Sequence, residues 1–393
     1  MSHAMLRSGM TFISDLSERS DGPNRAAAGA PHGGVGAHCE TGGQSNGPIG
    51  PPAARDGDAK TAACCVDRRN GDGAVMTDRR TLRVRSMRWE AEGIVGVELE
   101  PMTPDTLLPA PQAGAHVDLH LGNGCVRSYS LTNPGERHRW MLAVNRDAAS
   151  RGGSKWIHEA LRPGATLEVD GPRNHFALDE TAPHSVLIAG GIGITPLLAM
   201  ARRLAAIGKP WTLHYAARKR AQMAFVAALR DLAQRSGAML DLRCDHEGDA
   251  PLDLAAIVAT LPEGAHVYAC GPASLLAAYE AATAALPRER VHLERFASHQ
   301  EAATEGGFTV KLARDGRSVP IAKGRSILDA LIEIGLRPPH SCREGTCGSC
   351  ETRVLEGTPD HRDEVLTDAE RAEGTRMMIC CSGSKSAMLV LDL

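Results

Sequence analysis

Apolar and polar positions alternate in short, evenly spaced runs between about Thr81 and Asp170, with proline and glycine between the runs. A period of two is typical of half-buried strands, and this spacing predicts a small antiparallel β-barrel over residues 79–180. The predicted strands cover residues 82–84, 94–100, 117–121, 126–131, 139–144 and 166–170. One helical segment, residues 154–161, interrupts them.

After Pro183 the pattern changes, because short apolar runs now alternate with segments of helical period. The runs predict strands at residues 186–188, 212–215, 239–243 and 266–269, and helices at residues 196–207, 220–234, 252–260 and 274–286. Strands that alternate with helices indicate a parallel sheet covered on both faces. Residues 181–297 are therefore predicted to form an α/β domain.

A polar segment, residues 298–307, is expected to link this domain to a third one. Counted from residue 297, the eleven residues to 307 span at most ~36–40 Å when extended, so the last domain is not expected to be fixed in one pose. Strands are predicted at residues 308–312, 318–321, 352–355 and 388–391. A helix is predicted to begin after Ser326, with Asp329 three residues later completing its cap.

Residues 1–78 lack any sustained period, and roughly a quarter of them are glycine or proline, so they are predicted to be disordered. The start lacks the charged and apolar stretches of a secretory signal. Met76 stands where order is expected to begin, which suggests a hypothesis that translation could start there.

The chain has 393 residues, enough for two or three domains, and a net charge of -3, which argues against a nucleic-acid surface. It contains no apolar run of about eighteen residues, so no membrane span is expected. Eleven cysteines in a chain of this length fit a reducing compartment better than a disulfide framework. We therefore expect a cytoplasmic protein.

The most specific pattern is a set of three cysteines, Cys342, Cys347 and Cys350, separated by four and then two residues, with Cys380 some thirty residues later. This spacing is typical of plant-type ferredoxins, in which four thiolates hold a two-iron two-sulfur cluster. Structural zinc is the alternative, but zinc sites usually have two short cysteine pairs, and only Cys347 and Cys350 form one here. A dithiol redox pair would need neither Cys342 nor Cys380.

The fourth ligand of the predicted cluster is ambiguous by one residue, because Cys381 directly follows Cys380. On an extended segment adjacent side chains point to opposite faces. Only one of these two thiols is expected to face the metal.

Two motifs in the predicted barrel suit a phosphorylated planar ring. In the strand around residues 127–131, alternation places Arg127 and Tyr129 on one face and Ser128 and Ser130 on the other. Arginine beside an aromatic side chain suits such a ring, although an ordinary barrel strand explains the pattern too. Gly153 and Ser154 open the predicted helix, where free backbone N–H groups bind phosphate; the alternative is a glycine turn with a serine cap.

Two glycine turns follow strands of the predicted parallel sheet, at the edge where such sheets hold nucleotides. In the first, Gly191 and Gly193 fit the dinucleotide fingerprint, but Pro196 stands in place of the third glycine. The second contains Cys270 and Gly271 and would emerge at the same edge. Taken alone, it is better explained as a buried cysteine at a turn.

Together and in this order, these motifs resemble the phthalate dioxygenase reductase family, particularly its vanillate demethylase reductase branch. The resemblance runs from about Thr81 to Leu393. It rests on residues 113–119, 127–131, 172–176, 190–196, 270–272 and the cysteine loop 341–350.

The resemblance implies a multidomain fold with a flavin-binding antiparallel β-barrel domain, an NAD-binding α/β domain with a parallel sheet and a β-grasp ferredoxin domain of α+β type over residues 308–393. It implies FMN rather than FAD and NADH rather than NADPH. The implied flavin contacts are Arg127, Tyr129 and Ser130, with Gly153 and Ser154 at its phosphate; the implied nucleotide contacts are Gly191, Gly193, Thr195, Cys270 and Gly271. Ser130 and Cys270 take catalytic positions, and the implied cluster ligands are Cys342, Cys347, Cys350 and Cys380.

The implied activity is the transfer of single electrons from NADH to a Rieske oxygenase. A nicotinamide gives up two electrons as hydride and an iron-sulfur cluster accepts one, so a flavin is expected between them. A reductase of the same build that serves a P450 or a diiron hydroxylase is the first alternative. A non-catalytic metal-binding module is the second.

Overall fold

The computed structural model describes residues 79–148, 150–298 and 300–393, all within one compact unit. The predicted disordered tail and the possible start at Met76 lie outside the described residues. The described residues form three domains with separate sheets. This arrangement confirms the predicted multidomain fold class.

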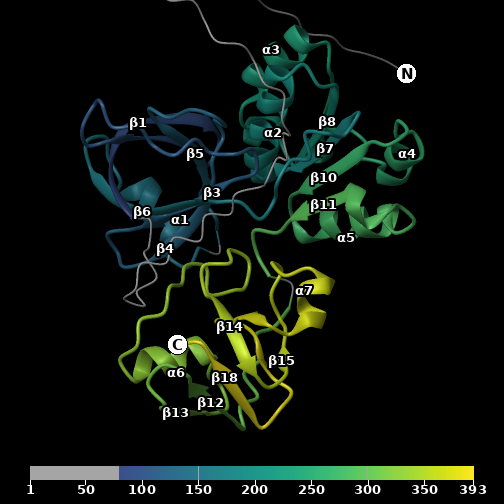
Figure 1. The fold of residues 1–393 in the computed structure, drawn as a ribbon. Coiled ribbons are helices and arrows are strands. Elements are labelled where there is room, and N and C mark those ends of the chain that lie inside the picture. The colour runs from purple at the N-terminus through teal and green to yellow at the C-terminus, as the bar shows by residue number, and fades with distance from the viewer. Residues whose placement is uncertain (1–78, 149, 299) are drawn as a thin grey trace, which may run out of the picture. The chain divides into compact units, whose positions relative to one another are not determined.

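The first domain is a six-stranded antiparallel barrel with the strand order β4-β3-β6-β1-β2-β5 (Figure 1, blue). A bridge between Leu131 and Leu142 brings the end of β4 to β5 and closes the sheet. Alternate side chains such as Leu119 and Trp140 fill its interior. The elements are β1 (Arg80–Ala91), β2 (Ile94–Pro101), β3 (His116–His120), β4 (Val126–Ser130), β5 (Trp140–Asn145), α1 (Gly153–Glu159) and β6 (Thr166–Arg173).

The second domain is a five-stranded parallel sheet with the order β11-β10-β7-β8-β9. Its strands are β7 (Ser185–Gly190), β8 (Trp211–Ala217), β9 (Met239–Cys244), β10 (His266–Cys270) and β11 (Val291–Glu294). Its main helices are α2 (Ile194–Ala206), α3 (Val226–Ser236), α4 (Leu254–Ala259) and α5 (Ala273–Thr283). Figure 1 shows α2 and α3 on one face and α4 and α5 on the other.

Alternation along β7 explains why both faces of this sheet are covered. Leu187 and Ala189 pack into the cluster that contains the α2 side chains, whereas Val186 and Ile188 pack into the cluster that contains α4 and α5 side chains. The strand is buried throughout, as expected for the centre of a parallel sheet. Because β8 lies on one side of β7 and β10 on the other, the strand order reverses here. Ligands bind at such a point, beyond the carboxyl ends of the two strands.

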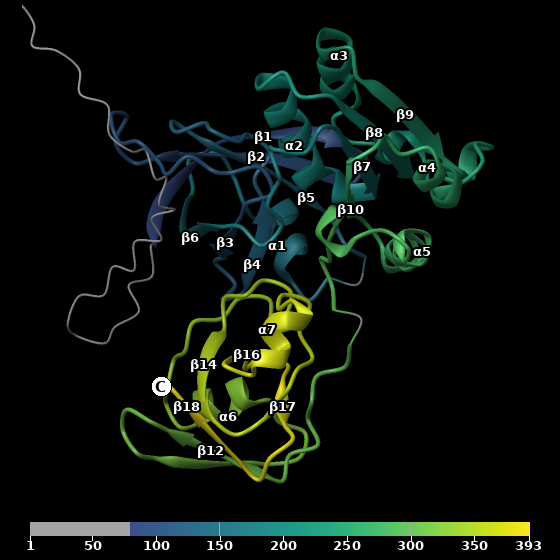
Figure 2. The same cartoon turned by 45° about the vertical axis from the view of Figure 1, so that its right-hand side comes forward.

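The third domain has a five-stranded mixed sheet with the order β13-β12-β18-β14-β16 and a separate short pair, β15 with β17. Figure 2 shows α6 beside β14 and β18, and its side chains Ile327, Leu328 and Leu331 share the core with this sheet. Ser326 caps α6 by accepting a hydrogen bond from the Asp329 amide, as predicted. The elements are β12 (Phe308–Leu312), β13 (Ser318–Ile321), α6 (Ile327–Glu333), β14 (Glu351–Glu356), β15 (Pro359–Asp360), α7 (Asp368–Glu373), β16 (Arg376–Met378), β17 (Gly383–Ser384) and β18 (Met388–Leu391).

The helix predicted at residues 220–234 is the clearest local difference. The structure has a short 3₁₀ turn at Arg220–Gln222, and α3 begins only at Val226. Phe225 takes a left-handed backbone conformation with φ +64°, which interrupts a right-handed helix. An aromatic residue gives no local signal for such a break.

The segment predicted as a free linker is partly held by the third domain. The Ala303 amide donates to the Cys381 carbonyl at 2.7 Å, and the Gly324 amide donates to the Thr304 carbonyl at 2.7 Å. Ala303 is buried. The free part of the linker is therefore shorter than the sequence indicated. None of the helices in the described part of the chain is long and apolar enough to cross a membrane.

Candidate functional site

Four buried cysteines meet at the loop before β14 and at the end of β16. The thiol of Cys347 lies within hydrogen-bonding reach of that of Cys342, and the thiol of Cys350 lies within reach of that of Cys380. All four are buried. The structure thus brings the four predicted ligands together as two pairs, which is the division that two irons require.

Backbone amides of the loop point at the sulfur atoms. Cys342 Sγ accepts hydrogen bonds from the amides of Glu344 and Thr346 at 3.3 and 3.4 Å, and Cys347 Sγ accepts one from the Cys342 amide at 3.4 Å. Positive φ angles at Gly345 and Gly348 turn the chain so that these amides face inward. Such bonds stabilise thiolates and tune the potential of iron-sulfur clusters.

The chemistry of the donor set fits a metal cluster. The neighbouring thiol and burial raise the pKa of Cys347, and the same two causes raise the pKa of Cys350. A bound cation would reverse this effect and deprotonate the thiols. The four buried thiols fit a two-iron cluster, with Cys342, Cys347, Cys350 and Cys380 as its predicted ligands.

The thiol of Cys381 lies against the cysteine loop. A Cβ atom built on Gly345 would lie 2.4 Å from Cys381 Sγ. This thiol also contacts the Met378 carbonyl at 3.7 Å. Cys380 as the fourth ligand stays a prediction.

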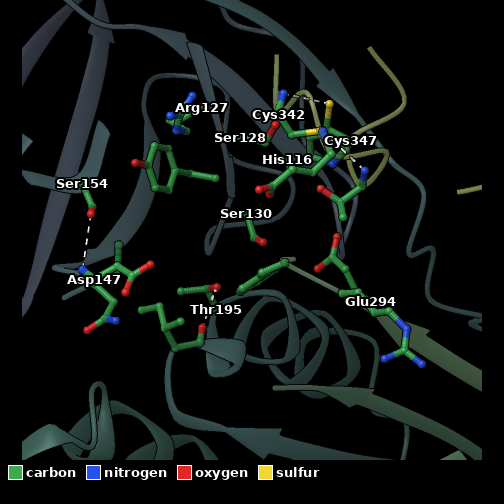
Figure 3. Close-up of a pocket in the computed structure, with 18 of the residues that line it drawn as sticks. His116, Arg127, Ser128, Ser130, Asp147, Ser154, Thr195, Glu294, Cys342 and Cys347 are labelled. Carbon is green, nitrogen blue, oxygen red and sulfur yellow. Dashed lines mark hydrogen bonds between the residues drawn. The ribbon is translucent and has the colours of Figure 1, made fainter. Parts of the chain in front are cut away.

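A cavity of about 280 Å³ lies beside the first thiol pair, and its walls come from all three domains. Figure 3 shows Arg127 and Ser154 on one side, Cys342 and Cys347 on another, and Thr195 and Glu294 facing them. Among the predicted residues, Arg127, Tyr129, Ser130, Ser154, Thr195, Cys342 and Cys347 line it, whereas Gly153, Gly191, Gly193, Cys270, Gly271, Cys350 and Cys380 do not.

The barrel wall of the cavity is built on β4 and the start of α1. A Cβ atom on Gly153 would lie 2.6 Å from Arg127 Cγ, so glycine is needed where the arginine crosses the helix start. Ser154 Oγ donates to Ser150 Oγ at 2.9 Å and accepts from the Asp147 amide at 3.3 Å. Burial raises the pKa of Tyr129, so its hydroxyl stays protonated.

The sequence analysis placed the β4 side chains on two opposite faces, but side chains from both faces line the cavity. Arg127, Ser128, Tyr129 and Ser130 all line it. β4 pairs with β3 along its whole length, but only the single bridge at Leu131 joins its other side to β5. Side chains from both faces of such a weakly paired edge can reach a cavity beside it.

The two glycine turns of the parallel sheet touch each other. A Cβ atom on Gly193 would lie 2.2 Å from the Cys270 carbonyl oxygen, and one on Gly190 would lie 2.6 Å from Pro272 Cδ. The backbones after β7 and β10 can approach so closely only because glycine stands at these positions. Thr195 follows the first turn, is buried, and donates its hydroxyl hydrogen to the Ile192 carbonyl at 3.0 Å.

Glu294 is a cavity residue that the sequence reasoning missed. It ends β11 as the register partner of Cys270, and its Oε2 atom is buried with no hydrogen-bond partner in the described part of the chain. Burial raises its pKa from the ordinary value of 4.5 to about 8. Burial, with a smaller contribution from Glu294, also raises the pKa of Cys270. The sequence analysis predicted no strand at Val291–Glu294 and therefore gave Glu294 no place at this edge of the sheet.

His116 was also missed, although it lies in one of the segments that carried the resemblance. Burial lowers its pKa to about 4, and its ring lies 5.6 Å from that of His175. Within residues 79–393 as described, His116 Nε2 has no hydrogen-bond partner. Two unpartnered polar atoms in one cavity wall, on His116 and Glu294, fit a bound molecule with polar ring edges.

Comparison with known proteins identifies two of these domains. The model of the 2Fe-2S iron-sulfur cluster binding domain matches residues 310–384, and that of the oxidoreductase NAD-binding domain matches residues 187–281. The phenoxybenzoate dioxygenase subunit beta of Ectopseudomonas oleovorans is 56% identical over 314 residues, which cover 80% of this chain and 97% of that protein.

Two solved structures share the fold across the described domains. Phthalate dioxygenase reductase, described as a modular structure for electron transfer from pyridine nucleotides to [2Fe-2S], is 40% identical with a TM-score of 0.61, covering 80% of this chain and 98% of that one. An intact type IV self-sufficient cytochrome P450 monooxygenase is 42% identical with a TM-score of 0.73, covering 80% of this chain. The present chain spans 41% of that longer protein.

Proposed function

The chain belongs to the phthalate dioxygenase reductase family, and from this premise we propose that it passes electrons from NADH through FMN and a 2Fe-2S cluster to a Rieske-type oxygenase. It is an NAD(P)H-dependent oxidoreductase of the kind that serves an oxygenase. The Rieske type of its partner, the preference for NADH and the residue roles below are the proposed parts.

The observation that carries the proposal is the cavity itself, whose wall contains Thr195 and Glu294 from the nucleotide domain and Cys342 and Cys347 from the ferredoxin domain. A group bound there has the nucleotide edge at one side and a thiol pair at the other. A bound flavin would supply the step between two-electron and one-electron carriers.

Arg127 and Ser154 are proposed to bind the flavin phosphate, with Gly153 leaving room for the arginine. A guanidinium presents several N–H donors in a fork that matches phosphate. Tyr129 and Ser130 line the same wall and are proposed to contact the ring. The Tyr129 hydroxyl, kept protonated by burial, can donate a hydrogen bond.

The nicotinamide nucleotide is proposed to bind where the strand order reverses, on Gly191, Gly193, Thr195, Cys270 and Gly271. The two glycine turns meet at this edge, beyond the carboxyl ends of β7 and β10, where parallel sheets bind a diphosphate. Ser130 and Cys270 are proposed to hold the nicotinamide ring against the cavity, each from its own domain. Cys270 is buried and its raised pKa keeps the thiol neutral.

A cluster-ligand variant tests the proposed order of transfer. Cys347→Ala should keep NADH-driven reduction of a small dye, because the cavity and the nucleotide edge remain. It should lose reduction of a one-electron protein acceptor. Full activity with the protein acceptor in this variant would refute the order, and purified wild-type protein without flavin absorbance would refute the proposal.

A further inference from the structure

A buried carboxylate of the barrel, Asp118 on β3, receives hydrogen bonds from two domains. It is 2% exposed. It accepts from Ser128 Oγ at 2.5 Å within the barrel and from Ser349 Oγ of the cysteine loop at 2.6 Å. The guanidinium of Arg173 on β6 also donates to it and forms an ion pair with it.

The same polar group makes two further contacts with the cysteine loop. Arg173 donates to Ser349 Oγ at 3.0 Å, and the hydroxyls of Ser128 and Ser341 are 3.2 Å apart. Ser341 directly precedes Cys342, and Ser349 Oγ lies 3.3 Å from Cys347 Sγ. Both serines that flank the cavity-facing thiols are therefore bonded to one group on the barrel.

The barrel holds Asp118 and Arg173 in place independently of the cysteine loop. Their strands β3 and β6 are neighbours in the same sheet. A buried carboxylate is costly unless its oxygens accept hydrogen bonds. Ser349 supplies one of these bonds, so docking of the loop completes the set of donors around a charge that is already fixed.

We propose that Asp118 is a positioning residue that docks the cysteine loop on the barrel and thereby sets the rate of electron transfer from the flavin to the cluster. This inference rests on the proposed function. An ion pair between Arg151 and Glu344 also joins the barrel to this loop, but the Arg151 side chain is half-exposed, and exposed pairs contribute little. Asp118 is the buried connection, and the distance between two carriers depends on it.

Asp170 on β6 offers a matched control, because it is the register partner of Asp118 and is also buried, at 8% exposure. Its carboxylate pairs with Arg79 and His120, both in the barrel. Asp170→Asn therefore removes a similar charge from the same sheet without removing a bond to the cysteine loop.

The first measurement is amide hydrogen exchange over residues 341–349, which needs no cofactor turnover. Asp118→Asn should exchange at least about tenfold faster in this loop, because the bond to Ser349 is weakened, while exchange in β12 and β18 stays the same. Asp170→Asn should leave the loop unchanged. Ser349→Ala removes the bond from the other side, leaves the barrel intact, and should repeat the effect even if Asp118→Asn does not fold.

The second measurement is rapid-mixing absorbance after NADH is added to the loaded protein. In Asp118→Asn and Ser349→Ala, reduction of the flavin should keep its rate, and electron arrival at the cluster should slow by at least about tenfold. Combining the two changes should add little, because both break the same bond. Unchanged loop exchange together with unchanged arrival at the cluster would overturn the inference. Faster exchange in a protein that never binds flavin would instead contradict the proposed function alone.

Discussion

Glu294 and Cys270 end two adjacent parallel strands as register partners, and Glu294 also faces the cavity. Cys270 lies in one of the segments that carried the resemblance, whereas Glu294 lies in none of them. Their pairing follows from the strand order, which places β11 beside β10 at the edge where the two glycine turns meet. Glu294 therefore reaches the cavity from the strand beside the one that ends in the buried Cys270.

The raised pKa of Glu294 predicts a pH dependence of stability. With a pKa near 8 when folded and 4.5 as the ordinary value, the carboxyl group stabilises the fold below pH 4.5 and loses that contribution as the pH rises towards 8. At roughly 1.4 kcal/mol per pKa unit, the loss is on the order of a few kcal/mol. Glu294→Gln cannot ionise. The Tm of Glu294→Gln relative to that of the wild type, measured by calorimetry, should therefore increase as the pH rises from 5 to 8.

An exposed glutamate of the same domain, Glu263, is the control for this experiment. Glu263→Gln should follow the wild type at both pH values. A constant Tm difference between Glu294→Gln and the wild type would show that the carboxyl group does not titrate in this range.

The contact between the two glycine turns predicts a strong effect of Gly193→Ala. The added Cβ would lie 2.2 Å from the Cys270 carbonyl oxygen, which is backbone and cannot rotate away. Overpacking of this kind costs about 1–3 kcal/mol and should move the turn after β10. The expected results are a lower Tm and a KM for NADH raised at least about tenfold. Gly208→Ala, which strains the backbone but meets nothing within 4 Å, should leave this KM unchanged.

Much of the fold could be predicted because the periodic runs of apolar residues are long or are clearly bounded by turn residues. The strands at Phe308–Leu312, Ser318–Ile321 and Met388–Leu391 have the predicted bounds, since alternating or continuous apolar residues there stand between turns. β15, β16 and β17 have only two or three residues each, so no period can be recognised in them. Their strand pairing depends on the fold around the cysteines rather than on local sequence.

Residues of the candidate site could be predicted where the chemistry fixes their spacing along the sequence. They could not be predicted where residues distant in the sequence become neighbours only in the folded structure. The four cysteines are separated by intervals that the cluster imposes, so their grouping could be inferred. His116 and Asp118 lie on β3 and Glu294 lies on β11, two strands that are far apart in the sequence. A single histidine or acid on a strand has no distinctive neighbours along the chain, and only the folded structure brings His116 and Glu294 to one cavity.

The two adjacent cysteines give a direct test of the fourth ligand. Cys380→Ser removes the thiol that pairs with Cys350, so the purified protein should lose most of its iron and acid-labile sulfide. Cys381→Ser changes a thiol that faces Gly345 and the Met378 carbonyl, and its iron and sulfide content should match the wild type. The two variants carry the same Cys→Ser change at adjacent positions, so they have the same amino-acid composition. Full iron content in Cys380→Ser would assign the fourth position to Cys381.

Arg127 is predicted to bind the phosphate of the flavin rather than its ring. Its guanidinium lies at the cavity wall beside Gly153 and Ser154. Hydrogen bonds to a charged group contribute about 1.5–3 kcal/mol, so Arg127→Ala should raise the Kd of the flavin-free protein for FMN by roughly 10- to 150-fold. Riboflavin has the same ring without the phosphate, and its Kd, followed by flavin fluorescence, should barely change. Equal losses for both ligands would mean that Arg127 contacts the ring, and the phosphate would then have to be assigned to other residues of the wall.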